Sequence, residues 1–106
     1  MWVYLNDAFV SAVEHKDDHQ LLVVRARVEG DLERFFRGMN INVQRHEDRD
    51  YLFRTIVTKQ TFARQLSAFA EAIDYPNFKG SIASSDHDRH DAYLRVWSVM
   101  ANLQYR

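Results

Sequence analysis

The chain has 106 residues, no cysteine and a formal net charge of -1, from 14 Lys and Arg against 15 Asp and Glu. A chain of this length buries about two-thirds of its surface when it folds, so we expect a single α+β domain over residues 1–106. The hydrophobic fraction of 46% is typical of globular proteins and excludes disordered or fibrous ones. Without cysteine, the chain has no disulfides, thiolate metal ligands or cysteine nucleophile.

The longest apolar runs, such as residues 21–24, are far shorter than the ~20 residues needed to cross a bilayer. Met1 is followed by Trp2 and Val3 with no basic segment. We therefore expect no contact with membranes and a cytoplasmic location. The near-neutral charge also argues against binding driven by neutralisation of phosphates, so nucleic acid is a less favoured partner.

Five segments have the composition and alternation of β-strands. The clearest is 20–29, where Arg25 and Arg27 fall on the face opposite Val24 and Ala26. A run of charged residues before the last segment predicts a hairpin with a long charged loop. The expected strands cover residues 2–5, 9–13, 20–29, 40–45 and 50–58.

Three segments have helical periodicity. Asp31 is a suitable N-cap for a short helix that ends at Gly38, a residue type that tolerates the left-handed conformation. Thr58 is suited to cap the second helix, and Ser85 or Asp86 the third. The expected helices cover residues 32–37, 59–73 and 87–103, and the apolar stripe of the last comprises Tyr93, Val96, Trp97, Met100 and Leu103.

The predicted element order is ββ-β-α-ββ-α-α. This order favours an α+β fold, with an antiparallel or mixed sheet of four to five strands and helices packed on one face. The middle of the chain contains most of a split β-α-β, or ferredoxin-like, arrangement. We expect the apolar stripes of all three helices to close onto this sheet. The other sheet face, with Arg25, Arg27 and Arg54, is then partly open.

The densest run of ionisable residues is 86–91, at the start of the last expected helix. His87 and Asp91 are four residues apart, as are Asp86 and His90, so each histidine has a carboxylate on its own helix face. A metal-dependent hydrolase would therefore be centred on His87, His90 and Asp91. No zinc motif accompanies them, and acidic residues at a helix N-terminus ordinarily cap it. We favour capping, and expect no metal or other cofactor.

No catalytic residue is indicated elsewhere. None of the serines lies in a Gly-x-Ser-x-Gly turn, and the three glycines form no phosphate-binding loop of the Walker or dinucleotide type. We therefore favour a protein without enzymatic activity.

Two groups of residues are candidates for contact with a partner. The aromatic residues of the loop 74–79 either fold back on the core or form part of a partner surface. The strand arginines are suited to bind phosphate or carboxylate, although a solvated or internally paired face is the favoured explanation. The candidate partner-binding residues are Tyr75, Asn77, Phe78, Lys79, Arg25, Arg27 and Arg54.

Several segments form a recognisable set: residues 5–9, 24–27 with 30–31, 50–51 with 53–54, 73–79, and 89–93 with 96–97. Together they resemble a family of small proteins found in bacterial genomes and in phages and other mobile elements. The resemblance spans nearly all of the chain, and Tyr75-Pro76-Asn77-Phe78-Lys79 is its most recognisable part. It brings no activity, cofactor or catalytic residue, and implies an accessory or host-interaction role by association only.

The leading hypothesis is a protein that acts through protein–protein contacts, as a homodimer or by docking on a larger protein. A specific form of it is a phage or mobile-element inhibitor of a host defence complex, of the anti-CRISPR kind. The alternatives are a metal-dependent hydrolase centred on residues 86–91, and a binder of nucleic acid or a phosphate ligand that uses the strand arginines.

Overall fold

The computed structural model describes all 106 residues, which fall into two compact units, Met1–Ile73 and Asp74–Arg106. The predicted α+β class is confirmed, as is the order ββ-β-α-ββ-α-α. We describe each unit by itself, and the single domain expected from the sequence stays a prediction. The elements are β1 (Trp2–Tyr4), β2 (Phe9–Glu14), β3 (Leu21–Ala26), α1 (Asp31–Phe35), β4 (Gln44–Arg45), β5 (Phe53–Thr58), α2 (Lys59–Glu71), the 3₁₀ helix η1 (Lys79–Ser81) and α3 (His87–Gln104).

The first unit contains one five-stranded sheet with the order β1-β2-β3-β5-β4, in which every neighbouring pair is antiparallel. β3 and β4 therefore run parallel to each other on either side of β5, with α1 in the connection between them. This is the predicted split β-α-β unit. A helix rather than a further strand follows α2, so the chain does not complete the β-α-β-β-α-β motif.

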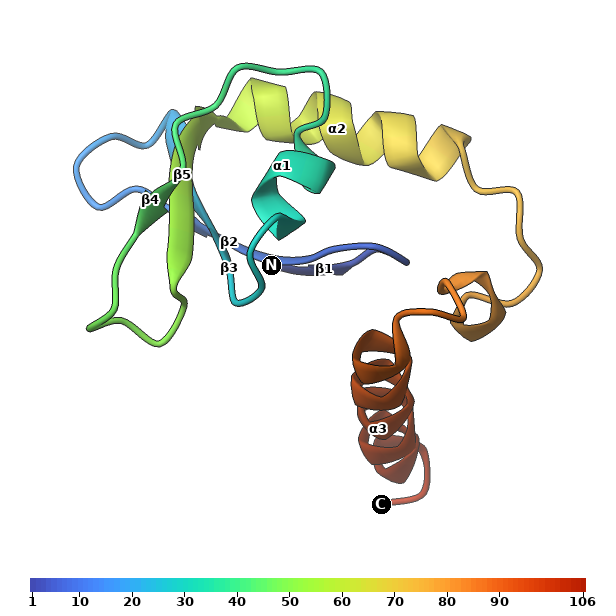
Figure 1. Cartoon of the computed structure of the whole chain (residues 1–106). Coiled ribbons are helices and arrows are strands. Elements are labelled where there is room, and N and C mark those ends of the chain that lie inside the picture. Colours follow the sequence, from blue (N-terminus) through green and yellow to red (C-terminus); the bar gives the residue numbers. More distant parts are fainter. The chain divides into compact units, whose positions relative to one another are not determined.

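The core of the first unit lies between one face of the sheet and the helices α1 and α2, which share that face (Figure 1). Phe35 of α1 is fully buried, and its ring centroid lies 5.2 Å from those of both Phe62 and Phe69 of α2. Burying a phenylalanine stabilises a fold by roughly 1.5–3 kcal/mol, so these rings fix both helices on the sheet. The buried apolar residues are Val10, Ala12, Val24, Ala26, Leu32, Phe35, Phe36, Phe53, Val57 and Phe62.

The start of α1 differs from the prediction. Its N-cap is Gly30, whose φ of 94° favours glycine, and Asp31 is already helical. The Asp31 side chain is 1% exposed, accepts a 2.9 Å hydrogen bond from the backbone N–H of Phe9, and pairs with Arg34. The N-cap predicted at Asp31 is wrong because its carboxylate bonds to β2 instead of to the helix's own first turn.

The start of α2 is as predicted, because the Thr58 hydroxyl accepts a 3.0 Å hydrogen bond from the Thr61 backbone N–H. The predicted strand 20–29 is too long at its C-terminal end. β3 stops at Ala26, since the chain turns there and the Asp31 N–H donates to the carbonyl of Val28 at 3.2 Å. The strand predicted over 40–45 is likewise reduced to the two residues of β4.

Replacing Asp31 by Ala leaves the Phe9 N–H without its acceptor and Arg34 without its ion-pair partner. We expect the free energy of unfolding to fall by about 2–3 kcal/mol. Urea unfolding followed by circular dichroism measures this loss. Asp91→Ala, which removes an exposed pair with Arg95, is the control and is expected to cost less than about 0.5 kcal/mol. Equal losses of unfolding free energy in the two variants would contradict a stabilising hydrogen bond between Asp31 and β2.

Candidate functional site

One row of side chains crosses the whole sheet on the face opposite α1 and α2. Trp2 lies opposite Ser11, which lies opposite Arg25. Arg25 in turn lies opposite Arg54, and Arg54 opposite Gln44. Directly opposed residues of neighbouring strands point to the same face, so the five side chains stand next to one another from edge to edge. We call these five residues the sheet row.

The two arginines at the centre of the sheet row have no acidic partner. No carboxylate forms an ion pair with Arg25 or Arg54. Arg25 donates a 2.8 Å hydrogen bond from Nη2 to the Ser11 hydroxyl, but the Nε atoms of both arginines are buried without a partner. Like charges directly opposite each other destabilise a sheet. This pair therefore carries an unrelieved electrostatic cost.

The surroundings of Arg54 add to that cost. Burial lowers the pKa of its guanidinium from the ordinary value, and the positive charges of Arg49 and Arg25 lower it further. Asp50 and Asp48 act in the opposite direction, but from beyond ion-pair distance. The net effect is a guanidinium that an added negative charge would stabilise.

Tyr51 positions the guanidiniums on this face. Its ring is 4% exposed, and the guanidinium carbons of Arg25 and Arg27 lie 4.6 and 4.1 Å from its centroid. Arg27 also donates a 2.8 Å hydrogen bond from Nη1 to the carbonyl of Asp50. Cation–π contacts of this kind hold a guanidinium in place without neutralising it. All three predicted strand arginines thus lie on the open face, and Tyr51 is the residue that orders two of them.

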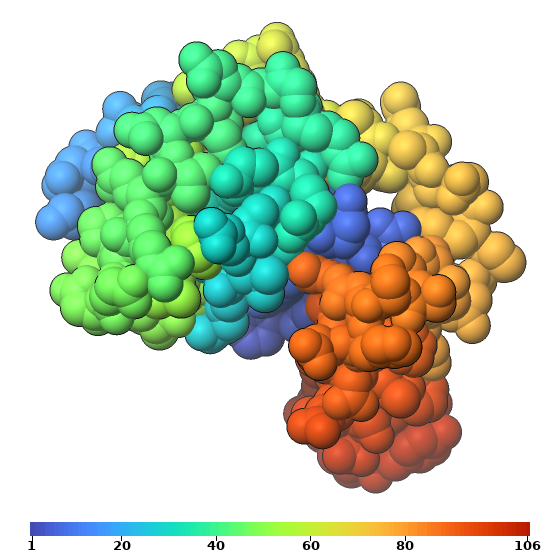
Figure 2. Space-filling view, in the orientation of Figure 1, coloured from blue at the N-terminus to red at the C-terminus, as the bar shows by residue number.

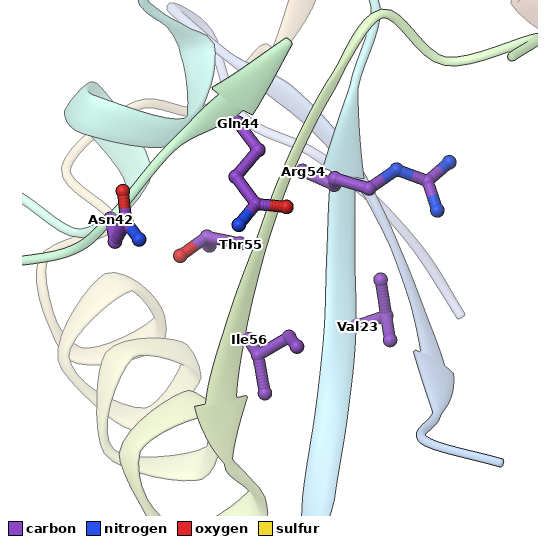
Figure 3. A pocket seen from close by; sticks show the side chains of 6 residues that line it. All are labelled: Val23, Asn42, Gln44, Arg54, Thr55 and Ile56. Carbon is purple, nitrogen blue, oxygen red and sulfur yellow. The ribbon is translucent and has the colours of Figure 1, made fainter. Parts of the chain in front are cut away.

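A hollow of about 280 Å³ lies beside Arg54 on the same unit. Figure 3 shows the side chains of Asn42 and Gln44 on one side of it, with Ile56 and Val23 below and the Arg54 side chain extending over β3. Sequence reasoning missed Asn42 and Gln44, although their alternation with apolar neighbours places both on one face. The lining residues are Val23, Asn42, Gln44, Arg54, Thr55 and Ile56.

In the second unit, the loop 74–79 packs against α3. Figure 2 shows α3 and the segment before it in orange and red. The rings of Phe78 and Tyr93 are stacked at 5.8 Å, and Tyr75 lies 5.8 Å from Phe78. Lys79 places its ammonium 4.1 Å from the centre of the Trp97 ring. Of the predicted contact residues in this loop, Tyr75 and Phe78 build the unit's own aromatic cluster, while Asn77 is exposed and accepts a hydrogen bond from Gly80.

Five large apolar side chains of α3 stay largely exposed: Val99 (65% exposed) and four others that are spaced three apart. The expected burial of the helix stripe is therefore wrong for three residues, Trp97, Met100 and Leu103. Tyr93 is the one apolar residue of α3 that is buried, because the loop 74–79 covers only the beginning of the helix. The four residues spaced three apart form one oblique ridge, which turns about half-way around the helix between Leu94 and Leu103. We call them the α3 stripe: Leu94 (40% exposed), Trp97 (57%), Met100 (55%) and Leu103 (51%).

The cluster at 86–91 lies at the N-terminus of α3. Asp86 is its N-cap and accepts a 3.2 Å hydrogen bond from the Arg89 backbone N–H. His87 and His90 line a shallow hollow of about 350 Å³, and Asp91 pairs with Arg95 at 3.3 Å. The structure brings no three His, Asp or Glu side chains together in a group that would hold a metal.

Comparison of the chain with protein-family models, curated proteins and solved structures finds no match. None of its helices is long and apolar enough to span a membrane. The functional inference therefore rests on the geometry of the two units.

Replacing Arg54 by Gln removes one of two opposed like charges together with a buried, unpaired N–H. We expect the free energy of unfolding to stay the same or to rise by up to about 1 kcal/mol. Arg25→Gln, which loses the bond to Ser11 and the contact with Tyr51, is expected to lower it by about 1 kcal/mol. Urea unfolding of both variants measures these changes in the free energy of unfolding. A loss for Arg54→Gln as large as that for Arg25→Gln would show that Arg54 has a structural partner.

Proposed function

We propose that this chain is a non-enzymatic binding module that acts through protein–protein contact, with the α3 stripe as its contact surface. The observation that supports the proposal is the exposure of Trp97 and three further apolar side chains along a single ridge. Contiguous apolar surface left exposed on a folded protein typically marks an interaction site. Tryptophan is also among the residues that contribute most to the binding energy of protein interfaces.

The geometry of the α3 stripe suits a helical partner. A ridge of residues three apart packs into the groove between the ridges of a second helix. Lys79 lies over the Trp97 ring and restricts its movement, so little side-chain freedom is lost when the indole is buried by a partner. Outside the stripe, α3 carries the exposed Val99 together with polar residues, Asn102 and the pair Asp91–Arg95, and the polar residues would form the rim of the interface.

The partner in this proposal is a second copy of the chain or a different protein. In a homodimer, the α3 stripes of the two copies would pack against each other about a two-fold axis, as in most symmetric dimers. An inhibitor of a host defence complex would instead apply the same stripe to a helix of its target. Both forms bury Trp97.

Trp97→Asp places a charge in the centre of the stripe and is expected to weaken association by at least about thirtyfold, the effect of losing a hot spot of roughly 2 kcal/mol. Light scattering over a range of protein concentrations measures self-association. For a different partner, a photo-crosslinking residue at position 100 is expected to capture a protein that the same residue at position 102 does not.

The matched control is Asn102→Asp, which adds the same charge on the polar side of α3 and is expected to leave association unchanged. Neither substitution is expected to change the melting temperature of the monomer. Three results together would show that the stripe belongs to the chain's own core. The wild-type chain would be a monomer, the crosslinker at position 100 would capture nothing, and Trp97→Asp alone would lower the melting temperature.

A further inference from the structure

The distribution of charge around the arginines of the chain is uneven. Carboxylates are available throughout, because the chain has 15 Asp and Glu. Six of the 11 arginines have no carboxylate partner, and among them only Arg25 and Arg54 lie directly opposite each other in the sheet. The arginines that have a carboxylate partner are Arg34, Arg37, Arg45, Arg89 and Arg95.

A phosphate group offsets the repulsion between these two like charges. It carries up to two negative charges, which offset the repulsion between Arg25 and Arg54, and its several oxygens accept hydrogen bonds from more than one guanidinium. A single carboxylate supplies one charge and two oxygens, so it satisfies the pair less fully. The Nε–H groups are buried, so a phosphate would bind the terminal Nη groups of these partly exposed side chains.

The hollow beside Arg54 provides room for the organic part of a phosphate ester. The amides of Gln44 and Asn42 offer hydrogen bonds to hydroxyl or carbonyl groups, and Val23 and Ile56 give an apolar surface. Its volume of about 280 Å³ is near the lower end of small-molecule sites. A long polyanion fits less well, because the chain has a net charge of -1 and no strong basic excess.

We propose that Arg54 and Arg25 bind the phosphate group of a small phosphate ester, whose organic part lies in the hollow lined by Asn42, Gln44 and Ile56. This binding function is additional to the protein contact proposed for α3. The two concern different units of the chain, so either is testable without the other.

Isothermal titration calorimetry with inorganic phosphate and with ribose 5-phosphate tests the proposal, against chloride of matched ionic strength. Both are expected to bind, ribose 5-phosphate more tightly, and Arg54→Gln is expected to weaken both by at least about tenfold. Arg45→Gln is the matched control. It removes the same charge from β4, but Arg45 already pairs with Glu47 and lies opposite Phe53, so binding is expected to be unchanged.

Ile56→Asp provides a second test, because it puts a negative charge into the hollow at a position that is 53% exposed and therefore tolerant of substitution. Loss of phosphate binding in this variant, with an unchanged melting temperature, supports the site. Absence of binding to phosphate and to ribose 5-phosphate in the wild-type chain overturns it. If single-stranded oligothymidylates bind more tightly as their length increases, while ribose 5-phosphate does not bind, the ligand is a nucleic acid and not a small ester.

Discussion

The alternation of side chains along β3 and β5 is the constraint on which both the core and the sheet row depend. Burying Val24 and Ala26 against the helices sends Arg25 to the other face, and the register of the two strands places it directly opposite Arg54. A slip of one residue would bring the arginines into the core. The hydrophobic pattern that forms the core is therefore the same pattern that brings two guanidiniums together on the open face.

The second unit has a smaller core than the first. It builds a small cluster from Tyr75, Phe78 and Tyr93 at the beginning of α3. The rest of this 18-residue helix keeps its apolar ridge exposed. Helices gain most of their stability in proteins from packing of an apolar face, so the exposed part of α3 has apolar surface still available for a partner. The two proposed binding functions thus arise from separate features of the chain, one electrostatic and one apolar.

Local patterns predicted much of the first unit. The alternation along β3 was sufficient to place Arg25 on the face opposite Val24 and Ala26, because a period of two leaves only two choices. The N-cap at Thr58 was predictable because its hydrogen-bond partner, Thr61, lies within one helical turn. The N-cap at Gly30 was not, because the carboxylate of Asp31 binds the Phe9 N–H, which lies far away in the sequence.

The candidate site itself was only partly predictable. Sequence alone could not show that Arg25 opposes Arg54, because that register depends on how the intervening chain turns. It also could not show which side of the loop 74–79 would face α3, since the same aromatic residues suit a core or an interface. Gln44 became part of the site only when strand pairing placed it opposite Arg54.

The most direct measurement of the central claim is nuclear magnetic resonance of the arginine Nε–H groups, recorded without and with inorganic phosphate. We expect the Nε–H signals of Arg25 and Arg54 to show no hydrogen bond in the free protein and to shift as phosphate binds the terminal nitrogens of the same guanidiniums. The Nε–H signal of Arg45, already bonded to Glu47, is expected to stay in place. An Arg54 signal that is hydrogen-bonded from the start, or that phosphate leaves unmoved, would contradict an open guanidinium pair on this face.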